Sequence, residues 1–142
     1  MTTSKALAHN PTVTITLASL ANNTFVASSE IDNSSNLDTD GWLVVKLKTG
    51  ASGVSATGLA NVYLLPSADN GTTYPDSTAN GGVLLGAIAL VANATTYIKA
   101  FRLVPYLPKK FKVAVENQSG AALDSTGGSH AITCETYSIQ TA

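Results

Sequence analysis

The chain has 142 residues and a formal net charge of −1, and only 12% of its residues are charged. This near-neutral balance excludes the basic surface of a nucleic-acid-binding protein, and it leaves little charge repulsion to oppose self-association. A single cysteine, Cys134, excludes an internal disulfide framework, so burial and backbone pairing must stabilise the fold.

The first eleven residues, 1–11, lack the alternation of a strand and end at Pro11. Either a frayed terminus or an arm that becomes ordered on a partner surface fits this pattern. Leu7, flanked by Ala6 and Ala8, favours the arm because it supplies an apolar anchor. The remaining residues, 12–142, are expected to form one domain.

Strand patterns begin directly after this segment. Apolar and polar residues alternate in 12–17 and again in 42–48, and a short additional strand is expected over 25–28. Each alternating segment directs one apolar face inward: Val13, Ile15 and Leu17 in the first, and Leu43, Val45 and Leu47 in the second.

Five further strands follow at the spacing typical of a sandwich. Residues 83–91 are so uniformly apolar that we expect them to be covered on both faces. Residues 111–116 alternate and direct Val113 and Val115 inward. The other expected strands span residues 59–65, 95–103 and 131–139.

About eight strands separated by turn-forming residues predict an all-β fold, a two-sheet antiparallel sandwich. The long polar connections over 29–40 and 67–82 favour a jelly roll, because such connections cross between sheets. An immunoglobulin-like sandwich is the second choice, since its cysteine pair is missing.

Membrane insertion and secretion find no support in the sequence. No run reaches the roughly 18 apolar residues of a membrane-spanning helix. The first ten residues lack the apolar stretch of a signal peptide. We therefore expect a protein made in the cytoplasm, without a membrane partner.

The residues that carry chemistry do not form a recognisable catalytic or metal-binding motif. His130 and Cys134 share one face of a predicted strand, but about 13 Å separates their Cα atoms, too far for a Cys–His pair. Cys134 is therefore expected in the core. Asn36, Asp38 and Asp40 occupy the first, third and fifth positions of a calcium-loop pattern, but its twelfth position is Leu47 instead of a bidentate acid. We expect no enzyme activity, no cofactor and no metal ion.

Two polar clusters are explained by local structure. Asp69, Asn70 and Gly71 precede Tyr74 and suit a turn with positive φ at Asn70 and Gly71, although a metal or sugar site is the alternative. The second cluster is basic, and its side chains are expected to be solvated or to face acidic groups, with phosphate binding as the alternative. It consists of Lys109, Lys110 and Lys112.

Four strings in the middle of the chain carry a family pattern. They are Ser29–Asn33 with Asn36–Leu37, Ala68–Tyr74, Val91–Tyr97 and Val115–Leu123. In this order they resemble segments of the small virion structural proteins of tailed bacteriophages, over most of residues 25–123. The resemblance implies a capsid decoration or cement protein on the capsid exterior.

Such proteins often adopt a jelly roll and often sit as trimers over the joints between capsomers. The resemblance therefore implies two partners, further copies in a homotrimer and the major capsid protein, and no nucleic acid. Within the arm, the candidate capsid contact residues are Lys5, Ala6, Leu7 and Ala8.

Two alternatives stay open. The first is a tail, neck or fibre component of the same virion. The second is a carbohydrate-binding or receptor-binding module, which usually presents an exposed aromatic platform. Only nine residues are aromatic, and Trp42, Phe101 and Phe111 lie within predicted strands, which favours the structural role.

Overall fold

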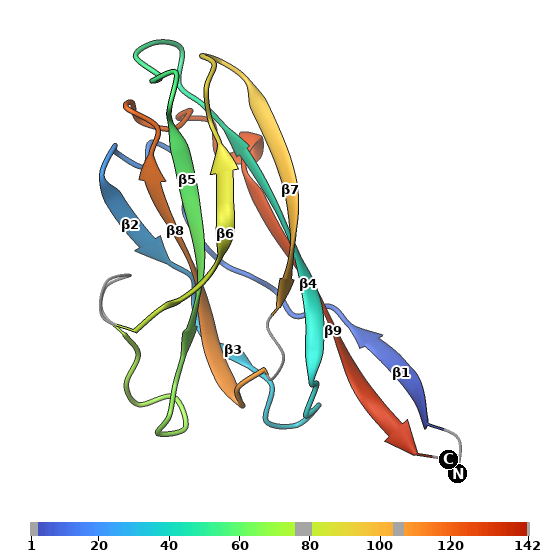
Figure 1. Ribbon diagram of the computed structural model, residues 1–142. Coiled ribbons are helices and arrows are strands. Elements are labelled where there is room, and N and C mark those ends of the chain that lie inside the picture. Colours follow the sequence, from blue (N-terminus) through green and yellow to red (C-terminus); the bar gives the residue numbers. More distant parts are fainter. Residues whose placement is uncertain (1–2, 76–80, 104–106, 142) are drawn as a thin grey trace.

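Within residues 3–75, 81–103 and 107–141, which the computed structural model describes, the chain forms nine strands in two antiparallel sheets (Figure 1). Side chains are described for residues 8–75, 81–103 and 107–138. The strands are β1 (Thr3–His9), β2 (Thr24–Ala27), β3 (Ile31–Asp32), β4 (Asp40–Lys48), β5 (Leu59–Pro66), β6 (Val83–Ala89), β7 (Thr96–Leu103), β8 (Lys110–Gln118) and β9 (Ala131–Thr141).

Sheet A has the order β1-β9-β4-β7, and sheet B has the order β2-β8-β5-β6, with β3 pairing beside β2 on β8. A short 3₁₀ helix, η2 (Gly127–Ser129), precedes β9. No helix among the described residues has the length and apolar character needed to cross a membrane. The predicted all-β, two-sheet antiparallel sandwich is confirmed, whereas the jelly roll remains a prediction.

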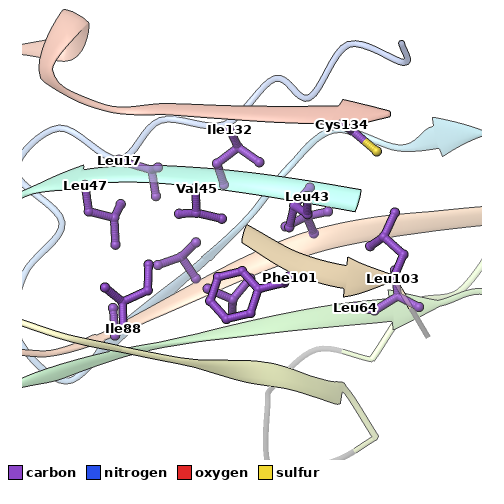
Figure 2. Close-up of a cluster of buried hydrophobic side chains, with 14 of the residues drawn as sticks. Leu17, Leu43, Val45, Leu47, Leu64, Ile88, Phe101, Leu103, Ile132 and Cys134 are labelled. Carbon is purple, nitrogen blue, oxygen red and sulfur yellow. The ribbon is translucent and has the colours of Figure 1, made fainter. Parts of the chain in front are cut away.

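The core lies between the two sheets and follows the predicted alternation (Figure 2). On β4, the inward residues are fully buried and the residues between them face outward. They pack with buried side chains of the other sheet, as expected when two inner faces interdigitate. The buried residues labelled in Figure 2 include Leu43, Val45, Leu47, Leu64, Ile88, Phe101 and Leu103. The predicted core residues Leu17, Val113 and Val115 are also buried, and Val13 and Ile15 pack against this cluster.

The predicted strand over 12–17 is wrong in its hydrogen bonding, although its burial alternates as expected. The segment is extended but belongs to neither sheet, and the Thr14 carbonyl accepts a hydrogen bond from the Ser29 amide at 2.8 Å. Val13 and Ile15 are half-buried and Leu17 is buried. An alternating pattern shows which side chains face the core. An extended segment can have this pattern without forming the hydrogen bonds of a sheet.

Residues 3–9 differ in the opposite sense, because the predicted unstructured arm contains strand β1. Its backbone pairs with the far end of β9, from Thr3 opposite Thr141 to His9 opposite Thr136. The partner strand lies more than a hundred positions away, so no local pattern announces the pairing.

Strand β6 is not covered on both faces, contrary to the expectation for residues 83–91. It lies at the edge of sheet B and pairs only with β5 among the described strands. Leu84 is 55% exposed. An apolar run therefore predicted the strand correctly but not its position at a sheet edge.

Candidate functional site

A two-stranded ribbon extends from the end of sheet A. Strand β4 pairs with β9 only up to Tyr137, whereas β1 accompanies β9 to Thr141. Beyond Tyr137 the backbone of β9 therefore has β1 as its one described ladder partner. Figure 1 shows this ribbon projecting past the sandwich. We refer to Thr3–Ala6 paired with Ser138–Thr141 as the terminal ribbon.

The candidate contact residues lie on β1. Lys5 and Ala6 pair with Ile139 and Ser138 in the terminal ribbon, and the register shifts between Ala6 and Ala8, which places Leu7 at a bulge. Ala8 is exposed. The side chains of Lys5, Ala6 and Leu7 lie outside the described part of the structure. Sequence reasoning assigned no strand to this segment, and its contact with a capsid stays a prediction.

A buried carboxylate anchors the base of this ribbon. The side chain of Asp38 is 1% exposed, and its two oxygens lie 2.9 and 3.0 Å from Nδ1 of His9. The Thr136 hydroxyl donates to the same carboxylate at 2.5 Å. The loop is held as well, because the Asn33 side chain exchanges two hydrogen bonds of 2.9 Å with the Asp38 backbone. The end of β1, the 33–39 loop and β9 are thereby joined at one point.

This cluster is an anchor rather than a catalytic relay. In a hydrolase triad the hydroxyl nucleophile bonds to the histidine, which removes its proton. Here Thr136 donates to Asp38. Sequence reasoning assigned no role to His9, and it placed Asp38 in a calcium-loop pattern that fails at its twelfth position. No local signal joins residues 29 and 98 positions apart.

The other candidate chemical groups also have structural partners. His130 uses both ring nitrogens, since Nδ1 accepts from the Lys48 amide at 3.3 Å and Nε2 bonds to the Asp124 carbonyl at 2.8 Å. Cys134 is buried in the core as predicted. Burial, and then the charge of Asp38, raises the pKa of its thiol to about 12. A thiol with so little thiolate at neutral pH is a poor nucleophile.

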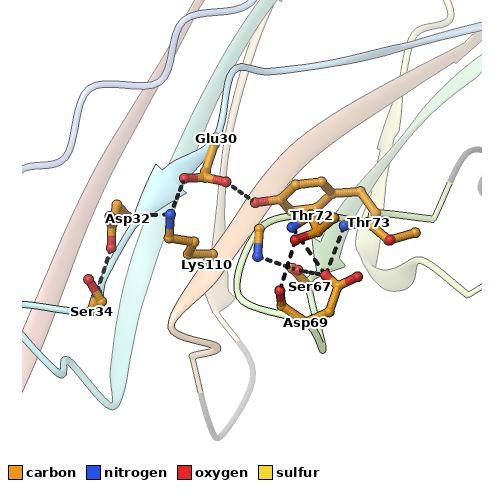
Figure 3. Close-up of polar contacts among 10 residues, drawn as sticks. Glu30, Asp32, Ser34, Ser67, Asp69, Thr72, Thr73 and Lys110 are labelled. Atoms are coloured by element: carbon orange, nitrogen blue, oxygen red, sulfur yellow. Dashed lines mark hydrogen bonds and ion pairs between the residues drawn. The ribbon is translucent and has the colours of Figure 1, made fainter.

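The predicted turn after β5 is confirmed and is fastened by Asp69 (Figure 3). Asn70 and Gly71 have φ values of 60° and 93°. The Asp69 carboxylate accepts hydrogen bonds of 2.8 Å from the Thr73 amide and the Ser67 hydroxyl. These bonds, led by those of Thr73, lower the pKa of Asp69 to about 2. The Asp69 carboxylate therefore forms hydrogen bonds within the turn, and Asn70 and Gly71 provide its backbone conformation.

The adjoining charged residues bind one another across β3 and β8 (Figure 3). Lys110 donates to Glu30 at 2.9 Å and lies 3.6 Å from Asp32. The Tyr74 hydroxyl donates to Glu30 at 2.5 Å, and the Lys112 ammonium lies 4.3 Å from the centroid of the Tyr74 ring. Two lysines of the predicted basic cluster thus face acidic or aromatic partners, and the Lys112 ammonium lies over one face of the half-buried Tyr74 ring.

The Asp69 turn supports an acid-sensitivity prediction. A carboxyl whose pKa is lowered on folding stabilises the protein above its unfolded pKa, near 3.8, and this stabilisation is lost as pH falls toward 2. We expect Asp69→Asn to be less stable than the wild type at pH 6, with the difference narrowing by pH 2. Urea denaturation at a series of pH values measures this difference. A gap that stays constant with pH would contradict the proposed role of the Asp69 charge.

The outer face of β4 carries an aromatic residue that sequence reasoning placed only inside a strand. Because Leu43 and Val45 face inward, Trp42 and Val44 face outward, and the Trp42 side chain is 47% exposed. Beside it lies a hollow of about 290 Å³. Its lining includes Asn10, Trp42, Val44, Thr133, Glu135 and Tyr137. The alternation of residues 42–48 is the sequence signal that predicts an exposed Trp42.

Comparisons with known proteins do not identify a family for this chain. No protein-family model matches the chain, and no curated protein matches it. Two surfaces of sheet A, the terminal ribbon and the Trp42 face, are suited to an interaction.

Proposed function

We propose that this chain is a non-enzymatic virion structural protein, a capsid decoration protein that stabilises the shell of a tailed bacteriophage. The observation that carries the proposal is the terminal ribbon. This ribbon extends beyond the sandwich and consists of two described strands, β1 and the end of β9. A two-stranded ribbon is marginally stable by itself in water, because little surface is buried for the backbone that it orders. A partner surface would supply the missing burial.

The composition of the chain agrees with assembly. The net charge is −1 and 12% of residues are charged, so electrostatic repulsion between copies is weak. The resemblance of residues 25–123 to small phage virion proteins gives the partner its identity, the major capsid protein. The candidate contact residues Lys5, Ala6, Leu7 and Ala8 lie on the strand that forms this ribbon.

The strand pairing supports the jelly roll within this proposal. The first strand pairs with the last, β2 and β3 pair with β8, β4 pairs with β7, and β5 pairs with β6. This nesting is that of one long antiparallel hairpin folded over into two layers, the four-stranded sheet A and the five-stranded sheet B. A jelly roll consists of two Greek keys, and this nesting supports that prediction.

The proposed mechanism is stabilisation by mass action. A protein that binds only the assembled shell shifts the equilibrium toward that shell. A closed homotrimer would present three terminal ribbons at once, so that weak contacts add through a high effective concentration. His9 and Asp38 would hold each ribbon in position at its base.

Deletion of residues 2–6 tests this role of the ribbon. The shortened chain retains His9 and its contact with Asp38, so the sandwich and the oligomer should persist. The affinity for expanded phage capsids should fall by roughly tenfold or more. Every subunit of the oligomer loses its ribbon contact, and these losses combine in multivalent binding. Sedimentation measures the oligomer, and co-pelleting with capsids measures attachment.

Leu84→Ala is the matched control, because Leu84 is an exposed apolar residue at the edge of the opposite sheet. This variant should bind capsids as the wild type does. A wild-type protein that is monomeric and never co-pellets with capsids would overturn the decoration role. Binding to purified tails instead would place the protein in the tail or neck.

A further inference from the structure

The hollow beside Trp42 combines an exposed ring with groups that donate and accept hydrogen bonds. In the ladder, Trp42 lies directly opposite Glu135 of β9, and Val44 lies opposite Thr133. Directly opposed residues on one face of an antiparallel pair have Cβ atoms about 4.5–5.5 Å apart. The hollow therefore has an indole ring and a carboxylate as immediate neighbours.

The polar groups of the hollow are arranged by the protein. The Tyr137 hydroxyl donates to the carboxylate of Glu135, two residues earlier in the same strand, and so orients that carboxylate. The Thr133 hydroxyl and the Asn10 amide also line the space. The nearest cation in the same row, Arg102 opposite Trp42, is paired with Asp40 at 3.6 Å. The lining thus combines neutral donors and acceptors with the negative charge of the Glu135 carboxylate.

We propose that this hollow binds a neutral saccharide, with one sugar ring stacked on Trp42. One face of a pyranose ring consists of C–H groups, and these pack against the electron-rich face of an indole. The hydroxyl groups at the rim of such a ring meet Glu135, Thr133 and Asn10. At about 290 Å³, the hollow lies at the small end of ligand sites and suits one or two sugar rings.

Other ligand classes fit the lining less well. An anionic phosphate group would meet the Glu135 carboxylate, and an acyl chain would leave the surrounding hydroxyl, amide and carboxylate groups without partners. A quaternary ammonium ion would need an aromatic cage, whereas the described lining supplies only Trp42 and Tyr137 as rings. The saccharide uses every kind of group that the hollow presents.

This site is independent of the proposed capsid role. Trp42 and Glu135 lie over the body of sheet A, whereas the terminal ribbon begins beyond Tyr137. Loss of saccharide binding would leave capsid attachment intact, and the reverse also holds. A decoration protein with this site would carry a sugar-binding surface on the particle.

Trp42 is the only tryptophan in the chain, so its fluorescence reports directly on the hollow. Glucose, galactose, N-acetylglucosamine, maltose, lactose and cellobiose are the probes, titrated to about 50 mM because weak saccharide sites have millimolar affinity. We expect at least one probe to shift the emission of Trp42 to shorter wavelength and to saturate. The full-length protein is used throughout.

Three variants locate the effect. Glu135→Gln retains the fluorescent reporter and an acceptor for Tyr137, and it should raise the dissociation constant by about tenfold through loss of a charge-assisted hydrogen bond. Ile98→Ala is the matched control, because Ile98 lies on the same outer face, is 68% exposed and does not line the hollow. It should bind as the wild type does. Trp42→Ala should abolish saturation-transfer NMR signals from the bound sugar.

Three results would overturn the proposal. The first is the absence of any emission shift or saturation-transfer signal with all six saccharides. The second is a response to choline without a response to any sugar. The third is emission that depends on protein concentration and not on sugar, which would make the Trp42 face a contact between copies of this chain.

Discussion

Replacing Leu43 with alanine is expected to lower the free energy of unfolding by about 2–5 kcal/mol and the melting temperature by roughly 6–20 °C. Leu43 is fully buried in β4 and lies between Phe101 of β7 and Cys134 of β9 in the ladder register. Each neighbour belongs to a paired strand, so the surroundings cannot collapse far into the cavity. Thermal denaturation at one fixed protein concentration measures the loss, because self-association makes the melting temperature depend on concentration.

Val44→Ala is the control for this core variant. Val44 is the next residue in the same strand, but its side chain faces outward and is 37% exposed. Its removal should change the free energy of unfolding by no more than about 0.5 kcal/mol. Equal losses from the two variants would contradict the assignment of the inner and outer faces of sheet A.

Asp38→Ala is expected to lower the free energy of unfolding by about 3 kcal/mol, because it removes a buried carboxylate from its hydrogen-bond partners. The Thr136 hydroxyl, which is buried, would lose its acceptor, and His9 would lose the contact that holds the end of β1. The amides of β1 should then exchange with solvent faster than those of β4, since local opening follows the loss of local contacts. Urea denaturation and hydrogen exchange measure the two effects.

Asp38→Asn separates charge from hydrogen bonding in this anchor. The amide retains the volume and an oxygen that accepts from Thr136, so only the interaction of a charged group with His9 is lost. We expect a smaller loss, about 1 kcal/mol. A loss as large as that of Asp38→Ala would mean that the charge, and not the buried hydrogen bond to Thr136, dominates the anchor.

The candidate functional regions differ in how far the sequence predicted them. The segment that holds Lys5, Ala6, Leu7 and Ala8 was expected to lack regular structure, but it contains strand β1, and its contact with a capsid stays a prediction. The Trp42 platform was overlooked although the alternation of residues 42–48 implies an outward side chain. In the first case the missing information is a distant partner strand, and in the second it is the hollow that neighbouring strands create beside the ring.

The sequence by itself determined the features that depend on neighbours along the chain. Side chains of a strand alternate between its two faces, so the pattern of residues 42–48 identified the buried Leu43, Val45 and Leu47. Positive φ is accessible to asparagine and glycine, so Asn70 and Gly71 identified their turn. Both effects arise within a few residues and need no knowledge of the rest of the chain.

Only the tertiary structure decided which extended segments pair and where the polar groups meet. Apolar and polar residues alternate clearly in 12–17, yet this segment pairs with no described strand. The alternation is poor in residues 3–9, yet they pair with β9. Ladder hydrogen bonds join backbone groups that every residue carries, so their partners are set by the arrangement of the sheets. The same arrangement brings His9, Asp38 and Thr136 into one buried contact from three distant parts of the chain.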